Sequence, residues 1–136
     1  MLEENLATRP ATLSFRALVD TEISIQGNDN TRTQTIQIKW NLVAILENGI
    51  RYSKSLGETY ISGSGFNVEG IKSNPGDFFA DLQDLNFDET HIVCGMLPLD
   101  AKELAEEILS ETVRGFTPEE RFRDWEKVDS PVSVGD

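Results

Sequence analysis

The sequence predicts an α+β domain in which an antiparallel β-sheet of about four or five strands, led by a long hairpin, packs with two or three C-terminal helices. Apolar and polar side chains alternate with period two over most of residues 13–56. In the second half, three segments carry the residues that typically start helices. The length of 136 residues fits a single domain, 1–136, with loosely held ends at about 1–10 and 130–136.

The first predicted hairpin joins a strand from Leu13 to Gln26 with a second strand that ends at Leu46. Between them, Gly27–Asn30 consists of residues that favour turns. A four-residue turn at this point would place Phe15 opposite Leu42. In that register the apolar rows of both strands share one face of the sheet, as a half-buried hairpin requires.

The second predicted hairpin turns at Asn48-Gly49, a strong signal for a two-residue turn, and continues into a strand over Ile50–Leu56. In this register Tyr52 faces Ile45, which makes the sheet apolar on a second face as well. Either the chain's own helices or a partner subunit should cover that face. The residues that would form it are Val43, Ile45, Ile50 and Tyr52.

A weaker fourth strand is expected from Thr59 to Ser64, after a turn at Gly57-Glu58, and it leads into the glycine-rich stretch Gly63–Gly70. This stretch matches neither the dinucleotide fingerprint nor the P-loop. Its simpler interpretation is a bulged strand that ends in a loop. The alternative is a ligand-binding loop, because glycine allows close backbone approach and Ser64 and Asn67 can form hydrogen bonds.

The next helix signal is Asn74-Pro75, which combines an N-cap residue with a proline at the first helical position and predicts a helix of about ten residues. A short buried strand is expected over Glu89–Gly95, because β-branched residues lie at its centre. Asp100 and Glu103 have the spacing of a capping box and predict a helix that ends at Gly115. The predicted apolar side of the first of these helices comprises Phe78, Phe79, Leu82 and Leu85.

The last predicted helix begins at Thr117-Pro118, again with an acid at the third helical position. It carries Phe122 and Trp125 one turn apart, so it should dock through these two rings. Two interpretations of the rings remain open. They pack on the sheet of their own domain, or they form a short interaction helix that binds another protein.

His91 and Cys94 are the only residues of their types. On a strand, residues three apart point to opposite faces, so the pair does not suit a nucleophile and base in contact. We expect a small buried thiol beside a partly buried histidine. A zinc site needs more histidines and cysteines than the chain has, and no metal or other cofactor is expected.

Four aspartates follow the spacing i, i+4, i+7 and i+11, which places Asp77, Asp81, Asp84 and Asp88 on one side of a helix long enough to include them. Three interpretations compete. The aspartates form a solvated face, or they form a surface for a basic protein partner, which includes mimicry of a nucleic-acid backbone. A Mg²⁺ or Ca²⁺ site is the least favoured, because one helix presents its carboxylates in line rather than around an ion.

The charge balance excludes several classes of function. The chain has 12 basic and 24 acidic residues, and residues 61–136 hold 17 of the acids against six basic residues. This charge disfavours binding of nucleic acid through a basic face and binding to anionic lipids. The longest apolar run, Leu42–Leu46, is far too short to span a membrane. The lone cysteine and the absence of a leader pattern at the N-terminus favour the cytoplasm.

These observations favour a non-catalytic interaction protein, such as an adaptor, inhibitor or assembly subunit, because no strong catalytic signature is present. The alternative is a small-molecule-binding protein or a small hydrolase with its pocket near Gly63–Gly70, where Ser64, Asn67 and Tyr60 would be the sensitive residues. A homo-oligomer formed through the second sheet face is a further possibility. The residues expected to contact a partner are Asp77, Asp81, Asp84, Asp88, Val43, Ile45, Ile50, Tyr52, Phe122 and Trp125.

Overall fold

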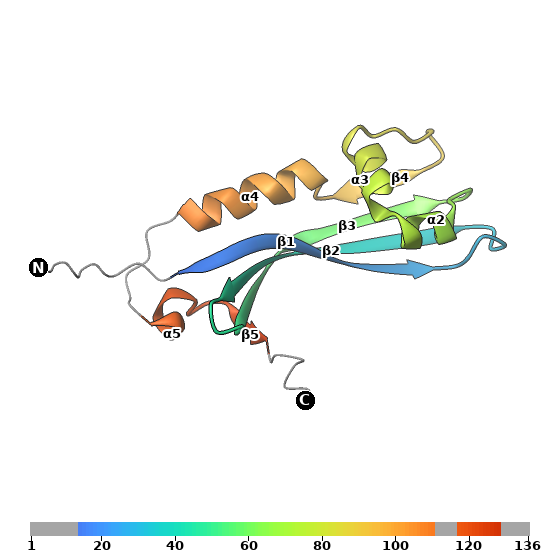
Figure 1. Cartoon of the computed structure of the whole chain (residues 1–136). Coiled ribbons are helices and arrows are strands. Elements are labelled where there is room, and N and C mark those ends of the chain that lie inside the picture. The colour runs from blue at the N-terminus through green and yellow to red at the C-terminus, as the bar shows by residue number, and fades with distance from the viewer. Residues whose placement is uncertain (1–13, 111–116, 129–136) are drawn as a thin grey trace, which may run out of the picture.

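A computed structural model describes residues 14–110 and 117–128 of the chain, and Figure 1 shows its arrangement. An antiparallel sheet packs with helices, which confirms the predicted α+β class. None of the described helices is long and apolar enough to cross a bilayer. In chain order the elements are β1 (Phe15–Gln26), β2 (Gln34–Leu46), β3 (Arg51–Gly63), α2 (Val68–Ser73), α3 (Pro75–Gln83), β4 (Ile92–Gly95), α4 (Pro98–Ser110), α5 (Pro118–Arg121) and β5 (Glu126–Val128).

The sheet has five strands in the order β1-β2-β3-β4, and β5 is a second partner of β3. The short strand β4 pairs with residues Thr59–Ser62 of β3, and β5 pairs with Arg51–Ser53 at the other end of the same strand. In Figure 1 helices α3 and α4 lie along one side of the long strands, and α5 lies near the opposite end of the sheet from α2. The sheet is therefore built from the hairpins β1-β2 and β2-β3. The short strands β4 and β5 pair with the edge of β3 that faces away from β2.

The predicted register of the first hairpin is wrong by four residues. Phe15 pairs with Leu46 rather than with Leu42, and Gln26 pairs with Thr35, so the seven residues 27–33 connect β1 to β2. Because the shift is an even number of residues, the apolar rows of both strands still share one face. The alternation of apolar and polar residues correctly predicted which face of the hairpin is buried. The length of the connecting loop determined which residues of β1 and β2 pair.

A buried side chain explains why the loop is longer than four residues. Gln34 is only 2% exposed, and its amide nitrogen donates to the backbone oxygens of Asn28 and Thr31. The backbone nitrogen of Thr31 also donates to the backbone oxygen of Asn28. The loop is thus closed by a turn and by one side chain instead of by further strand pairs, and β2 begins at Gln34.

The second hairpin differs from the prediction by one residue near its turn. Residues 47–49 form a three-residue loop, because the backbone N–H of Leu46 donates to the backbone oxygen of Ile50 and the oxygen of Leu46 accepts the N–H of Gly49. Gly49 has φ +91° and occupies the left-handed position of this loop. Tyr52 consequently pairs with Ala44, not with Ile45. A shift of one residue reverses the faces of a strand, so Tyr52 joins the side of the sheet that carries Ala44.

A bulge at Leu56 then changes the register again, because Trp40 pairs with Gly57 while Asn41 pairs with Ser55. The strand β3 continues through this bulge without a break. The predicted turn at Gly57-Glu58 and the separate fourth strand are therefore wrong. The extra residue in the bulge lets Leu56 and the even-numbered row of β2 remain in the same core.

The core lies on the side of β2 that carries its even-numbered side chains. Its main cluster joins the sheet to α2, α3 and α4, and a smaller cluster forms around Phe122. Trp125 contacts both clusters. The largest fully buried side chains of the described residues are Phe122, Ile36, Ile38, Leu42, Ile61, Leu82, Gln34, Val68 and Thr59.

The helices of the second half follow the predicted signals only in part. Helix α3 begins at Pro75 after the N-cap residue Asn74, as expected. Helix α4 begins at Pro98, two residues before Asp100, whose carboxylate accepts the backbone N–H of Leu97. The expected end of that helix at Gly115 lies outside the described residues. Helix α2, whose N-cap is Asn67, was not expected.

The last helix has the predicted start but is much shorter. Thr117 and Glu120 form a complete capping box, and α5 then ends at Arg121. Phe122 is the C-cap residue and Trp125 lies beyond the helix, before β5. The prediction of one helix carrying both rings is wrong.

The segment around His91 also departs from the prediction. Strand β4 lies at the edge of the sheet, with Ile92 67% exposed, and Cys94 is exposed rather than buried. An edge strand has only one neighbouring strand to cover it, which explains this exposure.

Candidate binding cleft

A cleft of about 550 Å³ opens between α2, α3 and the segment that joins α3 to β4. Its volume lies in the range of ordinary ligand sites, roughly 300–1,000 Å³. The glycine-rich stretch contributes Gly65, Phe66, Asn67 and Gly70 to its lining. The lining residues are Gly65, Phe66, Asn67, Gly70, Ile71, Ser73, Asn74, Asp77, Phe78, Asp81, Asn86, Phe87, Asp88 and His91.

Three phenylalanines form the apolar part of the lining. The ring centroid of Phe66 lies 6.2 Å from that of Phe78 and 5.8 Å from that of Phe87, and the last two are 5.9 Å apart. The first two side chains are almost fully buried and belong to the main core cluster. A rigid aromatic base of this kind offers ring faces and edges to a bound group.

Three carboxylates form the acidic part of the lining, and they come from two segments. Asp77 and Asp81 extend from α3, whereas Asp88 belongs to the segment after it. Helix α3 ends at Gln83, so the predicted row of four aspartates on one helix is interrupted, and Asp84 is the C-cap residue outside the lining. Within residues 14–110 and 117–128, no lysine or arginine lines the cleft. Among the described residues, no group of three or more His, Cys, Asp or Glu side chains is placed to hold a metal ion.

Local hydrogen bonds hold this wall in place. Asn67 caps α2 by accepting the backbone N–H of Gly70 at 3.0 Å. Asn74 donates its side-chain amide to Asp77 at 2.9 Å. The backbone N–H of Asn86 donates to the backbone oxygen of Asp81 at 2.8 Å, which turns the chain back after α3. Residues of the kind that favour caps and turns therefore shape the rim of the cleft.

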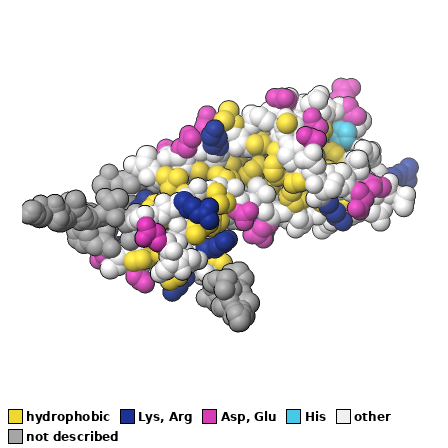
Figure 2. Space-filling model, viewed as in Figure 1, with side chains coloured by type: hydrophobic (Ala, Val, Ile, Leu, Met, Phe, Trp, Pro, Cys, Tyr) yellow, Lys and Arg dark blue, Asp and Glu magenta, His cyan; other side chains and the backbone are white. Residues whose placement is uncertain are grey.

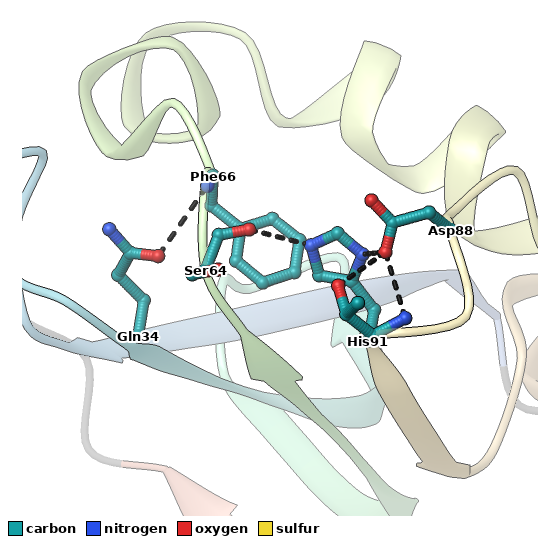
Figure 3. Close-up of polar contacts among 6 residues, drawn as sticks. Gln34, Ser64, Phe66, Asp88 and His91 are labelled. Carbon is teal, nitrogen blue, oxygen red and sulfur yellow. Dashed lines mark hydrogen bonds and ion pairs between the residues drawn. The ribbon is translucent and has the colours of Figure 1, made fainter.

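His91 closes one end of the cleft and is held from both sides, as Figure 3 shows. Its Nε2 lies 2.7 Å from the backbone oxygen of Ser64, and because a carbonyl only accepts, Nε2 is the donor. Its Nδ1 lies 2.9 Å from Asp88 Oδ1, although that contact is not a well-directed hydrogen bond. The imidazole ring stacks at an angle on Phe66 with centroids 4.6 Å apart.

Asp88 has further partners that fix its carboxylate. The backbone N–H of Thr90 donates to it at 2.9 Å, and the hydroxyl of Thr90 donates to the same oxygen. These hydrogen bonds, with a smaller contribution from the charge of His91, lower the pKa of Asp88. The carboxylate is therefore held in its charged form at the rim.

Gly63 explains how the imidazole can lie so close to the end of β3. A Cβ atom at this position would be 2.2 Å from His91 Cδ2, which is far inside contact distance. The absence of a side chain is thus a packing requirement. This glycine serves the contact with the histidine rather than a phosphate.

The other residues predicted for a ligand loop play different parts. Ser64 contributes its backbone oxygen to His91, and only Asn67 is in the lining. Tyr60 lies outside the lining at 40% exposure, with its hydroxyl donating to Glu58 at 2.5 Å and accepting from Gln37 at 3.1 Å. The bond to Glu58 raises the pKa of Tyr60.

The four residues predicted to form a second apolar face do not lie together. Val43 and Ile45 are on one side of β2 and are 8% exposed. Ile50 and Tyr52 belong to the smaller core cluster on the other side. The prediction that they share one face is wrong, because the three-residue turn reversed the faces of β3 near Tyr52.

The two rings near the C-terminal end pack against their own domain. Phe122 is 1% exposed, stacks on Tyr52 with centroids 4.8 Å apart and meets the edge of Phe15 at 5.2 Å. Trp125 contacts Phe122 at 4.9 Å. Packing within the domain, one of the two interpretations considered above, is what the structure shows for Phe122.

Several lining residues were missed by the sequence analysis, namely Phe66, Phe87, Asn74 and Asn86. The aromatic residues follow no common period, so no pattern relates them. The only available signal was the density of asparagine, glycine and aspartate between residues 63 and 88, which marks turns. Bringing these residues to one cleft depends on how α2 and α3 fold back over the sheet.

Comparison with protein-family models, with curated proteins and with solved structures found no match for this chain.

Proposed function

We propose that this protein is a non-catalytic interaction protein, an adaptor, inhibitor or assembly subunit, that receives a lysine or arginine side chain of a protein partner in the cleft. The observation that carries this proposal is the composition of the lining. Asp77, Asp81 and Asp88 line the same space as three aromatic rings, and none of the described lysines and arginines lines that space. Carboxylates and aromatic faces together are the groups that bind organic cations.

The surroundings of the cleft favour a protein partner over a free small molecule. Residues 61–136 carry 17 acidic against six basic residues, and Figure 2 shows acidic side chains spread over the helical part of the visible face. A broad negative potential of this kind attracts an extended basic surface and speeds its association. The cleft would then provide the specific contact within that broader attraction.

The second candidate is a small-molecule-binding protein that uses the same cleft. The volume of about 550 Å³ favours it, because it suits a ligand of moderate size. A small organic amine would find the same carboxylates and rings. The two candidates differ in whether binding needs a charged surface larger than the cleft.

The experiment titrates the protein with a hexalysine peptide at low salt and measures the affinity by calorimetry. The variant Asp77→Asn/Asp81→Asn removes two charges from the cleft, and Glu103→Gln/Glu106→Gln removes two exposed charges from α4 as a matched control. We expect the cleft variant to bind about tenfold more weakly, since two charge pairs of about 0.5–1 kcal/mol each are lost. The control should change affinity by less than about threefold, through the general field alone.

The outcomes separate the candidates. Equal weakening in both variants would show a general charge effect and would contradict a role for the cleft. Binding of butylammonium as tight as that of the peptide, with the same loss on Asp77→Asn/Asp81→Asn, would favour the small-molecule candidate. Amide shifts of Phe66 and Phe87 in NMR spectra would show whether the probe enters the cleft.

A further inference from the structure

We propose that two copies of this chain pair antiparallel through the outer edges of their β1 strands, around a two-fold axis at Leu18. Such a pairing would join two sheets into one continuous sheet. Strand addition at a free edge forms main-chain hydrogen bonds along the whole contact. The strand that pairs with the outer edge of β1 would be β1 of a second copy, for the reasons that follow.

The first support is the unprotected length of the edge. Within the described part of the chain, β1 pairs only with β2, through twelve consecutive residue pairs without a register shift. It contains no proline, glycine or bulge, which are three of the devices that prevent pairing of edges, while its exposed row carries the charges of Arg16, Asp20 and Glu22. The opposite edge of the sheet differs, since β4 and β5 cover parts of β3. In Figure 1 β1 lies along the border of the sheet over its full length.

The second support is the incomplete burial of β1 compared with β2. Its core-facing side chains are only half-buried at every position, whereas the even-numbered row of β2 is fully buried. On the other face of β1, Leu18 is 41% exposed. A further strand beside β1 would reduce the exposure of both rows.

The third support is a pair of charged residues, Arg16 and Asp20, that have no oppositely charged residue directly across the strand pair. Arg16 pairs across the strands with Ile45, and Asp20 pairs with Asn41. Glu22, by contrast, lies opposite Lys39 and accepts a hydrogen bond from Asn41 at 3.1 Å. Among the described residues, no ion pair involves Arg16 or Asp20.

An axis at Leu18 satisfies these features together. It places Arg16 opposite Asp20 of the partner subunit twice, by symmetry, and it places Leu18 opposite Leu18 of the partner subunit. An axis at Asp20 would put two like charges face to face, which is destabilising. An axis at Val19 would oppose Leu18 to a carboxylate and would pair Arg16 with Glu22, which already has partners in its own sheet.

Cysteine cross-linking tests this register. In a Cys94→Ser background, which removes the exposed native thiol, Leu18→Cys would bring two thiols together with Cβ atoms about 4.5–5.5 Å apart, close to the reach of a disulfide. The matched control is Ser24→Cys, on the same face of the same strand but far from the axis. We expect Leu18→Cys to give mostly covalent dimer on mild oxidation and Ser24→Cys to give little. Equal cross-linking of both variants would overturn the register.

Charge exchange provides a test that does not depend on oxidation. Arg16 and Asp20 are exposed, so their replacement should leave the fold intact, as thermal unfolding would verify. We expect light scattering at about 100 μM to show dimers for the native chain, at least about tenfold weaker dimers for Arg16→Asp, and recovery in Arg16→Asp/Asp20→Arg. A monomeric native chain at this concentration, or no recovery in the double variant, would overturn the proposal.

Discussion

The contact between Gly63 and His91 shows how one missing side chain shapes the cleft. Without a Cβ atom, the end of β3 allows the imidazole to reach the backbone oxygen of Ser64 and the rings beside it. A histidine held between a carbonyl and a carboxylate is a rigid end wall. The importance of this contact can be measured by placing a side chain at Gly63.

We predict that Gly63→Ala destabilises the fold by about 1–3 kcal/mol, because the added Cβ atom would lie 2.2 Å from His91 Cδ2 and must displace the ring or the strand. The control is Gly76→Ala in α3, where the added Cβ atom would lie 3.5 Å from Asn74 Oδ1 and alanine favours the helix. Urea unfolding of both variants measures the difference. Equal stability of Gly63→Ala and the native chain would contradict the required close contact.

The hydrogen bonds between Asp88 and Thr90, beside His91, depend on pH. Hydrogen bonds from Thr90 lower the pKa of Asp88 below the ordinary value of 3.8, so these contacts favour the charged carboxylate. Their contribution is complete above the ordinary value and is lost as the pH falls through the lowered one. We predict that the amide resonance of Thr90 in NMR spectra shifts on acidification with a midpoint below 3.8. Asp88→Asn should remove this titration, and a midpoint at or above the ordinary value would contradict the assignment.

Among the elements, α5 and β5 are short segments on either side of one buried aromatic residue, Phe122. Helix α5 has four residues and β5 has three, so neither is stable by its own hydrogen bonds. Phe122 between them lies against Phe15 and Tyr52 and anchors both to the sheet. The packing of Phe122 on Phe15 and Tyr52 therefore contributes to holding α5 and β5 against the sheet.

We predict that Phe122→Ala lowers the free energy of unfolding by about 3–5 kcal/mol, the usual effect of removing a fully buried ring. Arg123→Ala, at the exposed neighbouring position, should change it by less than about 0.5 kcal/mol. Denaturant unfolding followed by Trp fluorescence reports on the anchor directly, because Trp125 contacts Phe122. A small effect at Phe122 would mean that the ring is available for binding in trans instead.

At the scale of the whole molecule, the two proposed interactions differ in their physical origin. Binding of a basic partner depends on the net charge of -12. Pairing of β1 depends mainly on main-chain hydrogen bonds and on side chains packed between two strands. Salt would weaken its two Arg16–Asp20 charge pairs, but it would also screen the repulsion between two acidic chains, so these two effects oppose each other. Salt screens exposed charges over about 8–10 Å near physiological ionic strength. The two interactions should therefore respond differently to salt.

We predict that raising sodium chloride from about 20 mM to about 500 mM weakens hexalysine binding at least tenfold and changes the β1 dimer affinity by less than about threefold. Calorimetry measures the first quantity, and light scattering over a dilution series measures the second. If both interactions weakened in parallel, the dimer would depend on charge rather than on strand pairing.

Much of the architecture followed from local patterns. Alternation of apolar residues identified β1, β2 and the start of β3, and the capping residues around Asn74 and Thr117 marked the starts of α3 and α5. These signals act within a few residues, so they are readable before the chain folds. The register of the two hairpins could not be predicted from local patterns, because it depended on the buried amide of Gln34 and on a three-residue turn at Gly49.

The candidate cleft shows the same division. The sequence by itself determined that the second half is acidic, that a strand ends near Gly63 and that Asp77 and Asp81 share a side of one helix. Only the tertiary structure decided that Asp88 faces them across the cleft while Asp84 does not, and that His91 closes its end. The physical reason is that periodicity and capping are local, whereas the convergence of separate segments depends on the packing of α2 and α3 against the sheet.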